Sequence, residues 1–139
     1  MPVADGLSEN WIEVEVRIIW DVYRKSLTFG GRASRKEYWI FHLYITVLYS
    51  GFLALDILYF DYDFGSFPTP ALFFISSINF LTLLAVTVRR FHDVGLSGWY
   101  LLIWLIPYLG LILPFMILAS GGTQGDNEYG PEPEPALHA

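Results

Sequence analysis

The sequence contains no cysteine, and this absence excludes a disulfide framework, a thiolate metal site and a cysteine nucleophile. Charge is also scarce, because only 16% of the 139 residues are charged, against about 25% in a typical soluble domain. The first ten residues, MPVADGLSEN, lack the basic stretch followed by an apolar stretch that marks a cleavable signal peptide. We therefore expect the first membrane helix to direct insertion itself.

Apolar residues are what the sequence has in excess. Hydrophobic residues make up 54% of the chain and aromatic residues 18%, with a mean hydropathy of +0.43. One small domain cannot hide so much apolar surface in its own core, so a lipid environment is predicted. The formal net charge of -6 carries little weight, because charges of the two signs are segregated along the chain. We expect an integral membrane protein that binds no nucleic acid.

Three apolar segments are each close to the length of about 20 residues that a helix needs to cross a bilayer. They cover residues 38–60, 67–88 and 99–119. The third contains Pro107 and Pro114, so it is either a kinked span or a re-entrant hairpin. We favour the kinked span, because each half is too short to cross alone. The predicted fold class is all-α, an integral membrane bundle of about three transmembrane helices.

The residues before the first span have an amphipathic pattern. Over residues 11–25, most apolar side chains fall on one side of a helical wheel and most charged ones on the other; Val14 and Glu15 are the exceptions. The local alternation also fits a strand, but a lone strand beside a membrane would leave its edges unpaired. An amphipathic helix lying in the membrane interface is therefore favoured.

The positions of Lys and Arg predict the orientation. All eight lie before the first span or directly after the second, and basic flanks stay in the cytoplasm, so we predict a multi-pass protein with a cytoplasmic N-terminus. The turn containing Asp61, Asp63 and Gly65 then lies outside. Three spans put the C-terminus outside as well, whereas a hairpin third segment would put it inside.

Three regions follow from these patterns: an N-terminal segment at 1–26, a transmembrane domain at 27–120 and a tail at 121–139 rich in Gly, Pro and acidic residues. The tail has no apolar periodicity, and we expect it to be extended or disordered after Tyr129.

The motif FGGRASRKEYW, at residues 29–39, combines a helix start with basic residues. Ser34 and Glu37 have the spacing of a capping box, in which each side chain bonds the backbone of the other residue. Arg32, Arg35 and Lys36 are suited to anionic headgroups, and the aromatic residues that follow suit the membrane interface. We favour this anchoring role over a specific ligand site.

The motif RRFHDVGLSGWY, at residues 89–100, predicts a tight cytoplasmic turn. Arg89 and Asp93 are four residues apart and can pair on one helix face, Gly95 suits a left-handed helix end, and Ser97 suits the next N-cap. Two arginines beside a helix start near Trp99 could hold a phosphate group, such as that of a lipid.

A catalytic role for this motif is weaker. It would make His92 a general base oriented by Asp93, but adjacent side chains on a helix diverge by about 100° and no nucleophile accompanies them. Inside the spans, His42 and Asp56 are predicted to lie near opposite interfaces. Asn79 is predicted at mid-membrane, level with Gly51, where it makes an interhelical hydrogen bond.

Four stretches together resemble the DUF805 family of small bacterial inner-membrane proteins: FGGRASRKEYWIF, RRFHDVGLSGWY, the proline and glycine of IPYLG, and GTQGDNEYGPEP. They cover about residues 27–132. The resemblance implies a location in the bacterial cytoplasmic membrane, and it implies no activity, because the family is defined by a domain of unknown function.

The function that we expect is non-enzymatic, with no cofactor or metal. A cytoplasmic arginine-rich face would bind anionic lipid headgroups or a membrane-protein partner, which includes a second copy of the chain. The alternatives are a subunit of an oligomeric transporter or channel, lined by His42, Asp56 and Asn79, and a membrane enzyme acting on a phosphorylated lipid. The predicted lipid- or partner-binding residues are Arg32, Arg35, Arg89, Arg90, His92, Asp93, Ser97 and Trp99.

Overall fold

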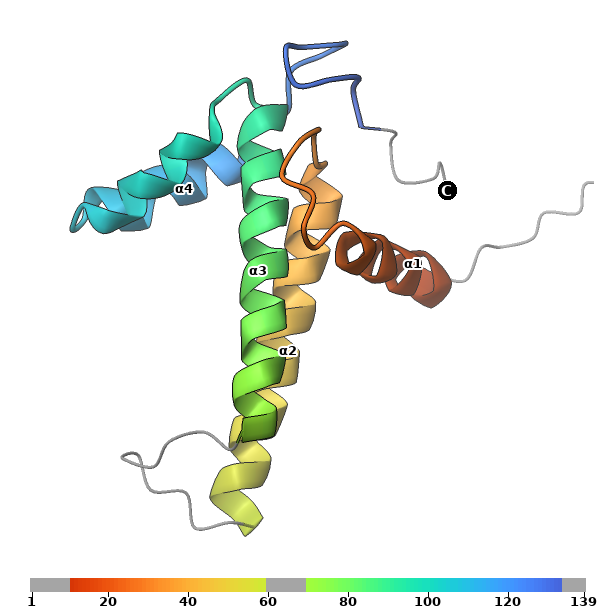
Figure 1. The fold of residues 1–139 in the computed structure, drawn as a ribbon, viewed down its shortest axis with the longest axis vertical. Coiled ribbons are helices and arrows are strands. Elements are labelled where there is room, and N and C mark those ends of the chain that lie inside the picture. The colour runs from red at the N-terminus through yellow and green to blue at the C-terminus, as the bar shows by residue number, and fades with distance from the viewer. Residues whose placement is uncertain (1–10, 60–69, 134–139) are drawn as a thin grey trace, which may run out of the picture.

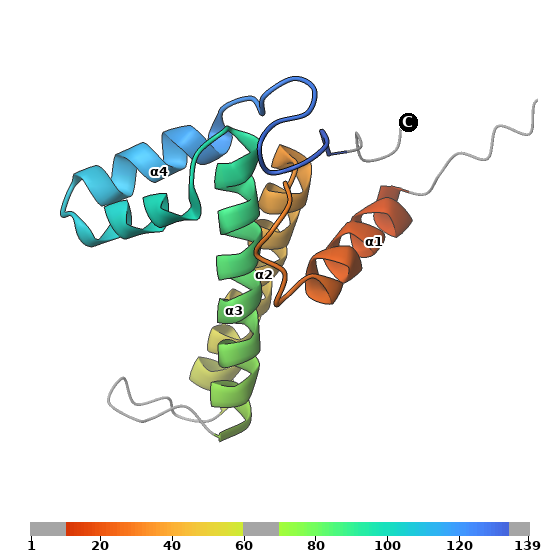
Figure 2. The same cartoon turned by 45° about the horizontal axis from the view of Figure 1, so that its top comes forward.

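The computed structural model describes residues 11–59 and 70–133, which form four α-helices and one 3-10 helix. They are α1 (Trp11–Arg24), α2 (Arg35–Tyr59), α3 (Pro70–Asp93), η1 (Gly98–Leu105) and α4 (Leu109–Ala119). The long helices α2 and α3 lie side by side and run antiparallel (Figure 1). Two arms project from this pair at steep angles: α1 on one side and the η1–α4 hairpin on the other (Figures 1 and 2). Both arms leave the half of the pair that contains the start of α2 and the end of α3.

Helices α2 and α3 coincide with the first two apolar segments that the sequence predicts as spans. Within them, Arg35–Leu55 and Phe74–Asp93 are 21 and 20 residues long and apolar enough to cross a membrane. The capping box sets the start of α2: the Glu37 N–H donates to Ser34 Oγ (3.1 Å), and the Ser34 N–H donates to Glu37 Oε2 (2.9 Å). The predicted outer turn, with Asp61, Asp63 and Gly65, lies outside the described residues.

The third apolar segment is a helical hairpin, so the favoured kinked span is wrong. Helix α4 runs back along η1, and the Thr123 N–H donates to the carbonyl of Asp93 (2.8 Å), so the chain returns to the end of α3 that it left. Pro107 cannot donate a hydrogen bond, and Tyr108 has a φ of 65°, which together break the helix at the tip. Each arm is about 16 Å long, roughly half of a hydrocarbon core.

Glycine allows the two arms of the hairpin to approach closely. A Cβ on Gly110 would lie 2.7 Å from the carbonyl oxygen of Ile103 and 2.8 Å from that of Trp104, both in η1. Any larger residue would push α4 away from η1. The glycine of the IPYLG stretch therefore has a packing role that a continuous span would not need.

Helix α1 confirms the predicted amphipathic helix, but the stripe of residues that packs against the helix pair is not the centre of the predicted apolar face. Val14, Ile18 and Val22, spaced four residues apart, are buried against the helix pair, whereas Val16 and Trp20 are exposed. Val14, which the helical wheel put among the charged residues, thus begins the buried stripe. The remaining apolar surface of α1 faces outward, as an interfacial helix requires.

The C-terminal segment makes hydrogen bonds within the protein beyond Tyr129, where the sequence predicted an extended or disordered tail. The tail was expected to extend away after Tyr129, but the carbonyl of Gly130 accepts a hydrogen bond from Arg32 (3.4 Å). Glu132 Oε2 accepts a hydrogen bond from the Gly125 N–H (2.7 Å). Backbone groups of this segment therefore find partners within the protein, which compensates for its lack of apolar residues.

Candidate functional site

Three distant motifs meet at the carboxylate of Asp93. Arg32 Nε donates to Asp93 Oδ1 (2.9 Å), and Arg90 Nη1 donates to Oδ2. The side chains of all three residues are at most 5% exposed. The predicted pair of Arg89 with Asp93 is wrong, because both oxygens of Asp93 are taken by Arg32 and Arg90. Two guanidinium groups and one carboxylate leave an excess positive charge that other acceptors must compensate.

Backbone carbonyls supply those acceptors. Arg32 donates through Nη2 to Thr123 (2.5 Å) and through Nη1 to Gly125 (2.5 Å). Arg90 donates through Nε to Leu118 (3.0 Å) and through Nη2 to Ser120, at the end of α4. The last carbonyls of a helix lack intrahelical partners and carry partial negative charge, so a buried arginine is well placed there.

Glycine is required where the returning chain passes Asp93. A Cβ on Gly122 would overlap Oδ2 of Asp93, whereas nothing lies within 4 Å of a Cβ on Gly121. Sequence reasoning missed the role of residues 120–130, because they were interpreted as a tail. The signal was present in the spacing of GGTQGDN, whose small residues allow a backbone to approach buried side chains.

The turn after α3 has the predicted geometry. Gly95 has a φ of 77°, and Ser97 caps η1 by accepting a hydrogen bond from the Trp99 N–H (3.4 Å). The His92 ring stacks on Tyr129 with centroids 4.0 Å apart, and its Nδ1 lies 3.1 Å from the carbonyl oxygen of Gly31. His92 and Asp93 therefore point to different neighbours. Trp99 is 78% exposed.

The four arginines predicted to share a ligand have different surroundings. Arg32 and Arg90 are bonded within the protein, as described above. Arg35 is exposed in the first turn of α2. Arg89 is buried, and no described residue forms a hydrogen bond with its guanidinium nitrogens, although Glu37 interacts with it electrostatically.

The predicted interhelical role of Asn79 is confirmed. Its Oδ1 accepts a hydrogen bond from the Tyr23 hydroxyl of α1, and its Nδ2 lies 3.5 Å from the Tyr49 hydroxyl of α2. The expected close approach at Gly51 is wrong, because nothing lies within 4 Å of a Cβ there. Longer tyrosine side chains bridge the distance instead. The side chain of Asp56 lies outside what the structure describes.

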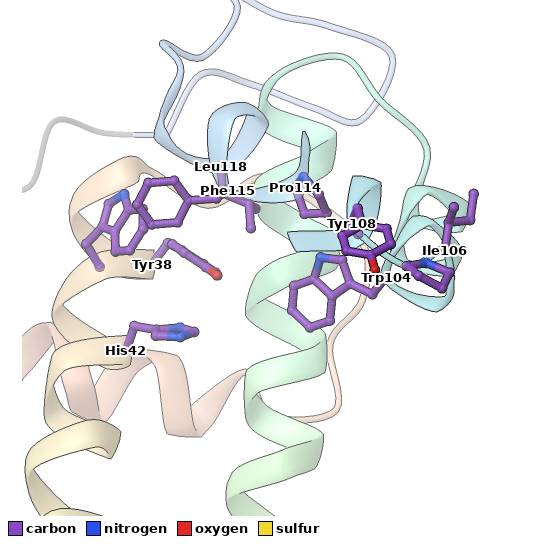
Figure 3. A pocket seen from close by; sticks show the side chains of 11 residues that line it. Tyr38, His42, Trp104, Ile106, Tyr108, Pro114, Phe115 and Leu118 are labelled. Atoms are coloured by element: carbon purple, nitrogen blue, oxygen red, sulfur yellow. The ribbon is translucent and has the colours of Figure 1, made fainter. Parts of the chain in front are cut away.

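A cavity of about 710 Å³ lies between the start of α2 and the hairpin (Figure 3). Tyr38 and His42 come from α2, and aromatic residues of the hairpin face them. No described residue forms a hydrogen bond with Nδ1 of His42, which is buried. The lining residues are Tyr38, Trp39, His42, Trp104, Ile106, Pro107, Tyr108, Gly110, Pro114, Phe115 and Leu118.

Comparison with known proteins places these motifs in a family. Residues 26–131 match the family described as "Protein of unknown function (DUF805)". The chain is 34% identical over 115 residues to Inner membrane protein YhaH of Escherichia coli K12, covering 81% of this chain and 93% of that protein. It is 31% identical over 113 residues to Inner membrane protein YhaI of the same strain, covering 81% and 92%. No solved structure matches. The matched residues include the whole Arg32–Arg90–Asp93 cluster and the segment that closes over it, and the chain therefore belongs to the DUF805 family.

Proposed function

We propose that this protein is a non-enzymatic, multi-pass protein of the bacterial cytoplasmic membrane whose cationic end binds anionic lipid at the cytoplasmic face. The observation that carries the proposal is the location of the exposed cations. Of the eight Lys and Arg residues, three are buried, which leaves five exposed. All five lie on α1, directly after it, or in the first turn of α2; they are Arg17, Arg24, Lys25, Arg35 and Lys36.

The two arms supply apolar surface beside these cations. Trp20 of α1 is 62% exposed, and Leu105 and Tyr108 of the hairpin are 78% and 81% exposed. Apolar surface of this extent is unfavourable in water and favourable at the boundary between headgroups and acyl chains. Each basic residue near an anionic membrane surface adds about 1 kcal/mol of attraction.

The orientation follows from the same charges. Basic flanks remain in the cytoplasm, and the basic residues cluster where α2 begins and α3 ends. Two crossings, by α2 and α3, return the chain to the side on which it started. The inner-membrane relatives support the choice of membrane.

A non-enzymatic role is supported by the contacts of His92 and Asp93, the two side chains that a catalytic role for this motif would need. His92 stacks on Tyr129, and Asp93 is bonded to two arginines, so neither residue is available to orient or activate the other. General acid–base catalysis needs such a pair within hydrogen-bond reach of a substrate.

The test is the lipid that co-purifies with the protein from native membranes. We expect anionic lipid to be enriched over the host membrane, and substitution of Gln at Arg17, Arg24, Lys25 and Lys36 to remove most of that enrichment. A control variant with Glu13→Gln, Glu15→Gln and Asp21→Asn alters the acidic residues of the same helix and should retain it. Equal anionic content in the wild type and the fourfold Gln variant would contradict the proposal.

A further inference from the structure

We propose that the cavity between α2 and the η1–α4 hairpin binds one anionic phospholipid, with an acyl chain inside the cavity and the phosphate at Arg35. This inference rests on the proposed function and names its binding site. It commits to a membrane lipid as the occupant, because the cavity is apolar inside and Arg35 lies one helical turn before the lining residue Trp39 on the same face of α2.

The interior of the cavity suits hydrocarbon. Its walls are aromatic and aliphatic, and no lysine, arginine, aspartate or glutamate is among the lining residues that the structure describes. Trp39 of α2 and Phe115 of α4 both line the cavity, with ring centroids 5.3 Å apart. The volume of about 710 Å³ lies within the usual range of about 300–1,000 Å³ for ligand pockets. An apolar cavity beside a membrane is filled more favourably by an acyl chain than by water.

His42 gives the cavity one polar contact. Its ring lies at the cavity, and its buried Nδ1 has no partner among the described residues (Figure 3). A small rotation of the His42 ring would turn this nitrogen toward an occupant of the cavity, and a hydrogen bond there would remove the cost of leaving it unsatisfied. The glycerol region of a phospholipid carries ester carbonyls as acceptors, and hydroxyl groups in some lipids as donors, so it can bond either tautomer of His42.

Arg35 provides the cation at the mouth. Arg35, Trp39 and His42 are spaced by four and three residues, so they lie on one face of α2, and Arg35 is about 10 Å from His42 along the helix axis. Arg35 also lies close enough to Arg90 for their charges to interact, and Arg90 is bonded to the carbonyl of Leu118, a residue that lines the cavity. The exposed guanidinium is therefore beside the rim and can bind two phosphate oxygens.

The test measures lipid retention by native mass spectrometry of the full chain after exchange into detergent with phosphatidylglycerol or phosphatidylcholine. We expect one phosphatidylglycerol to remain bound. Ile106→Trp fills the cavity and should lower its occupancy fivefold or more. Ile112→Trp adds the same side chain to an exposed hairpin residue outside the cavity lining and should leave occupancy unchanged. Equal retention by these two variants would overturn the proposal.

Three further variants separate the contribution of the lipid headgroup from that of the acyl chain. Arg35→Gln should reduce the preference for phosphatidylglycerol over phosphatidylcholine severalfold. Lys36→Gln, at the next residue of α2, should reduce it less, because it removes the general attraction of one charge but no bond to the phosphate. His42→Phe keeps the ring volume and should weaken retention of both lipids. If neither Arg35→Gln nor His42→Phe alters retention, the site is not the one described. Soluble glycerol phosphate should not displace the lipid, and displacement would show that the acyl chain contributes nothing.

Photo-crosslinking shows directly where the acyl chain of the bound lipid lies. Phosphatidylglycerol with a diazirine near the end of one acyl chain should label the peptide that contains Trp104 to Phe115. Labelling confined to α1 would overturn the cavity assignment while leaving general anionic-lipid binding intact. A lipid-free dimer in the native mass spectra that Ile106→Trp disrupts and Ile112→Trp does not would identify a second copy as the occupant and would also overturn it. If the wild type itself co-purifies with no excess of anionic lipid, the proposed function is contradicted, and not only the cavity assignment.

Discussion

The surroundings of each arginine decide its role more than its position in a motif does. Arg89 and Arg90 are adjacent and equally buried, yet Arg90 has three hydrogen-bond partners and no described residue bonds the guanidinium of Arg89. A buried charge with good partners is costly to remove, because the partners are left unsatisfied, whereas removal of an unpaired charge relieves desolvation.

We expect Arg90→Met and Arg89→Met to differ strongly in thermal unfolding in detergent. Arg90→Met leaves the carbonyls of Leu118 and Ser120 and one oxygen of Asp93 without their partner and should cost about 3 kcal/mol or more. Arg89→Met should change the free energy of unfolding by less than about 1 kcal/mol, or raise it. Similar losses in both variants would mean that Arg89 is paired in solution.

Local sequence patterns predicted local structure well. The capping box of Ser34 and Glu37, the positive φ of Gly95 and the N-cap at Ser97 depend on residues within one helical turn, so the sequence contains all that is needed to predict them. The partners of Arg32 lie 61 to 98 residues away, and no periodicity links such distant positions. The Asp93 cluster could therefore be predicted as a set of motifs but not as a set of contacts.

At the scale of elements, the hairpin shows why length and hydropathy are insufficient. Residues 99–119 contain no charge and are long enough to span, and a span is favoured from the sequence because each half of the segment is too short to cross alone. The outcome is decided by the close packing at Gly110, the break at Pro107 and the hydrogen bonds that Arg90 makes with the end of α4. These tertiary contacts hold the end of α4 beside α3.

Gly110→Ala should open the hairpin. The added methyl group would meet backbone atoms of η1, which cannot move aside as a flexible side chain can, so we expect a loss of about 1–3 kcal/mol of stability. Gly121→Ala is the matched control, because its Cβ meets nothing within 4 Å. Thermal unfolding of both variants in the same detergent is the measurement. A melting temperature that falls equally for both would argue against close packing at Gly110.

At the scale of the whole molecule, the hairpin predicts on which side of the membrane the C-terminus lies. The Thr123 N–H bonds the carbonyl of Asp93, so the end of the hairpin and the end of α3 are at the same end of the helix pair. With α2 and α3 as the two crossings, both termini should lie on one side of the membrane, unlike the arrangement expected from three spans.

Topology reporters test this arrangement. A reporter fused after Ala139 should report the cytoplasm, as should one fused before the N-terminus, whereas one inserted at Gly65 should report the opposite side. The physical reason is that an even number of crossings returns the chain to its starting side. A periplasmic signal from the C-terminal fusion would restore the third span and contradict the hairpin.

The hydrogen bonds of Arg32 also set a condition on biogenesis. Its acceptors at Thr123 and Gly125 are 91 and 93 residues further along the chain, so they are synthesised after both long helices. Until then, Arg32 lacks two of the carbonyl acceptors that offset the excess charge of its cluster with Arg90 and Asp93. A chain cut short at Ser120 would contain every long apolar segment and still leave this cluster incomplete. We expect such a truncated chain to be less stable than one that contains residues 121–130, because a buried arginine would be left with unmet hydrogen bonds.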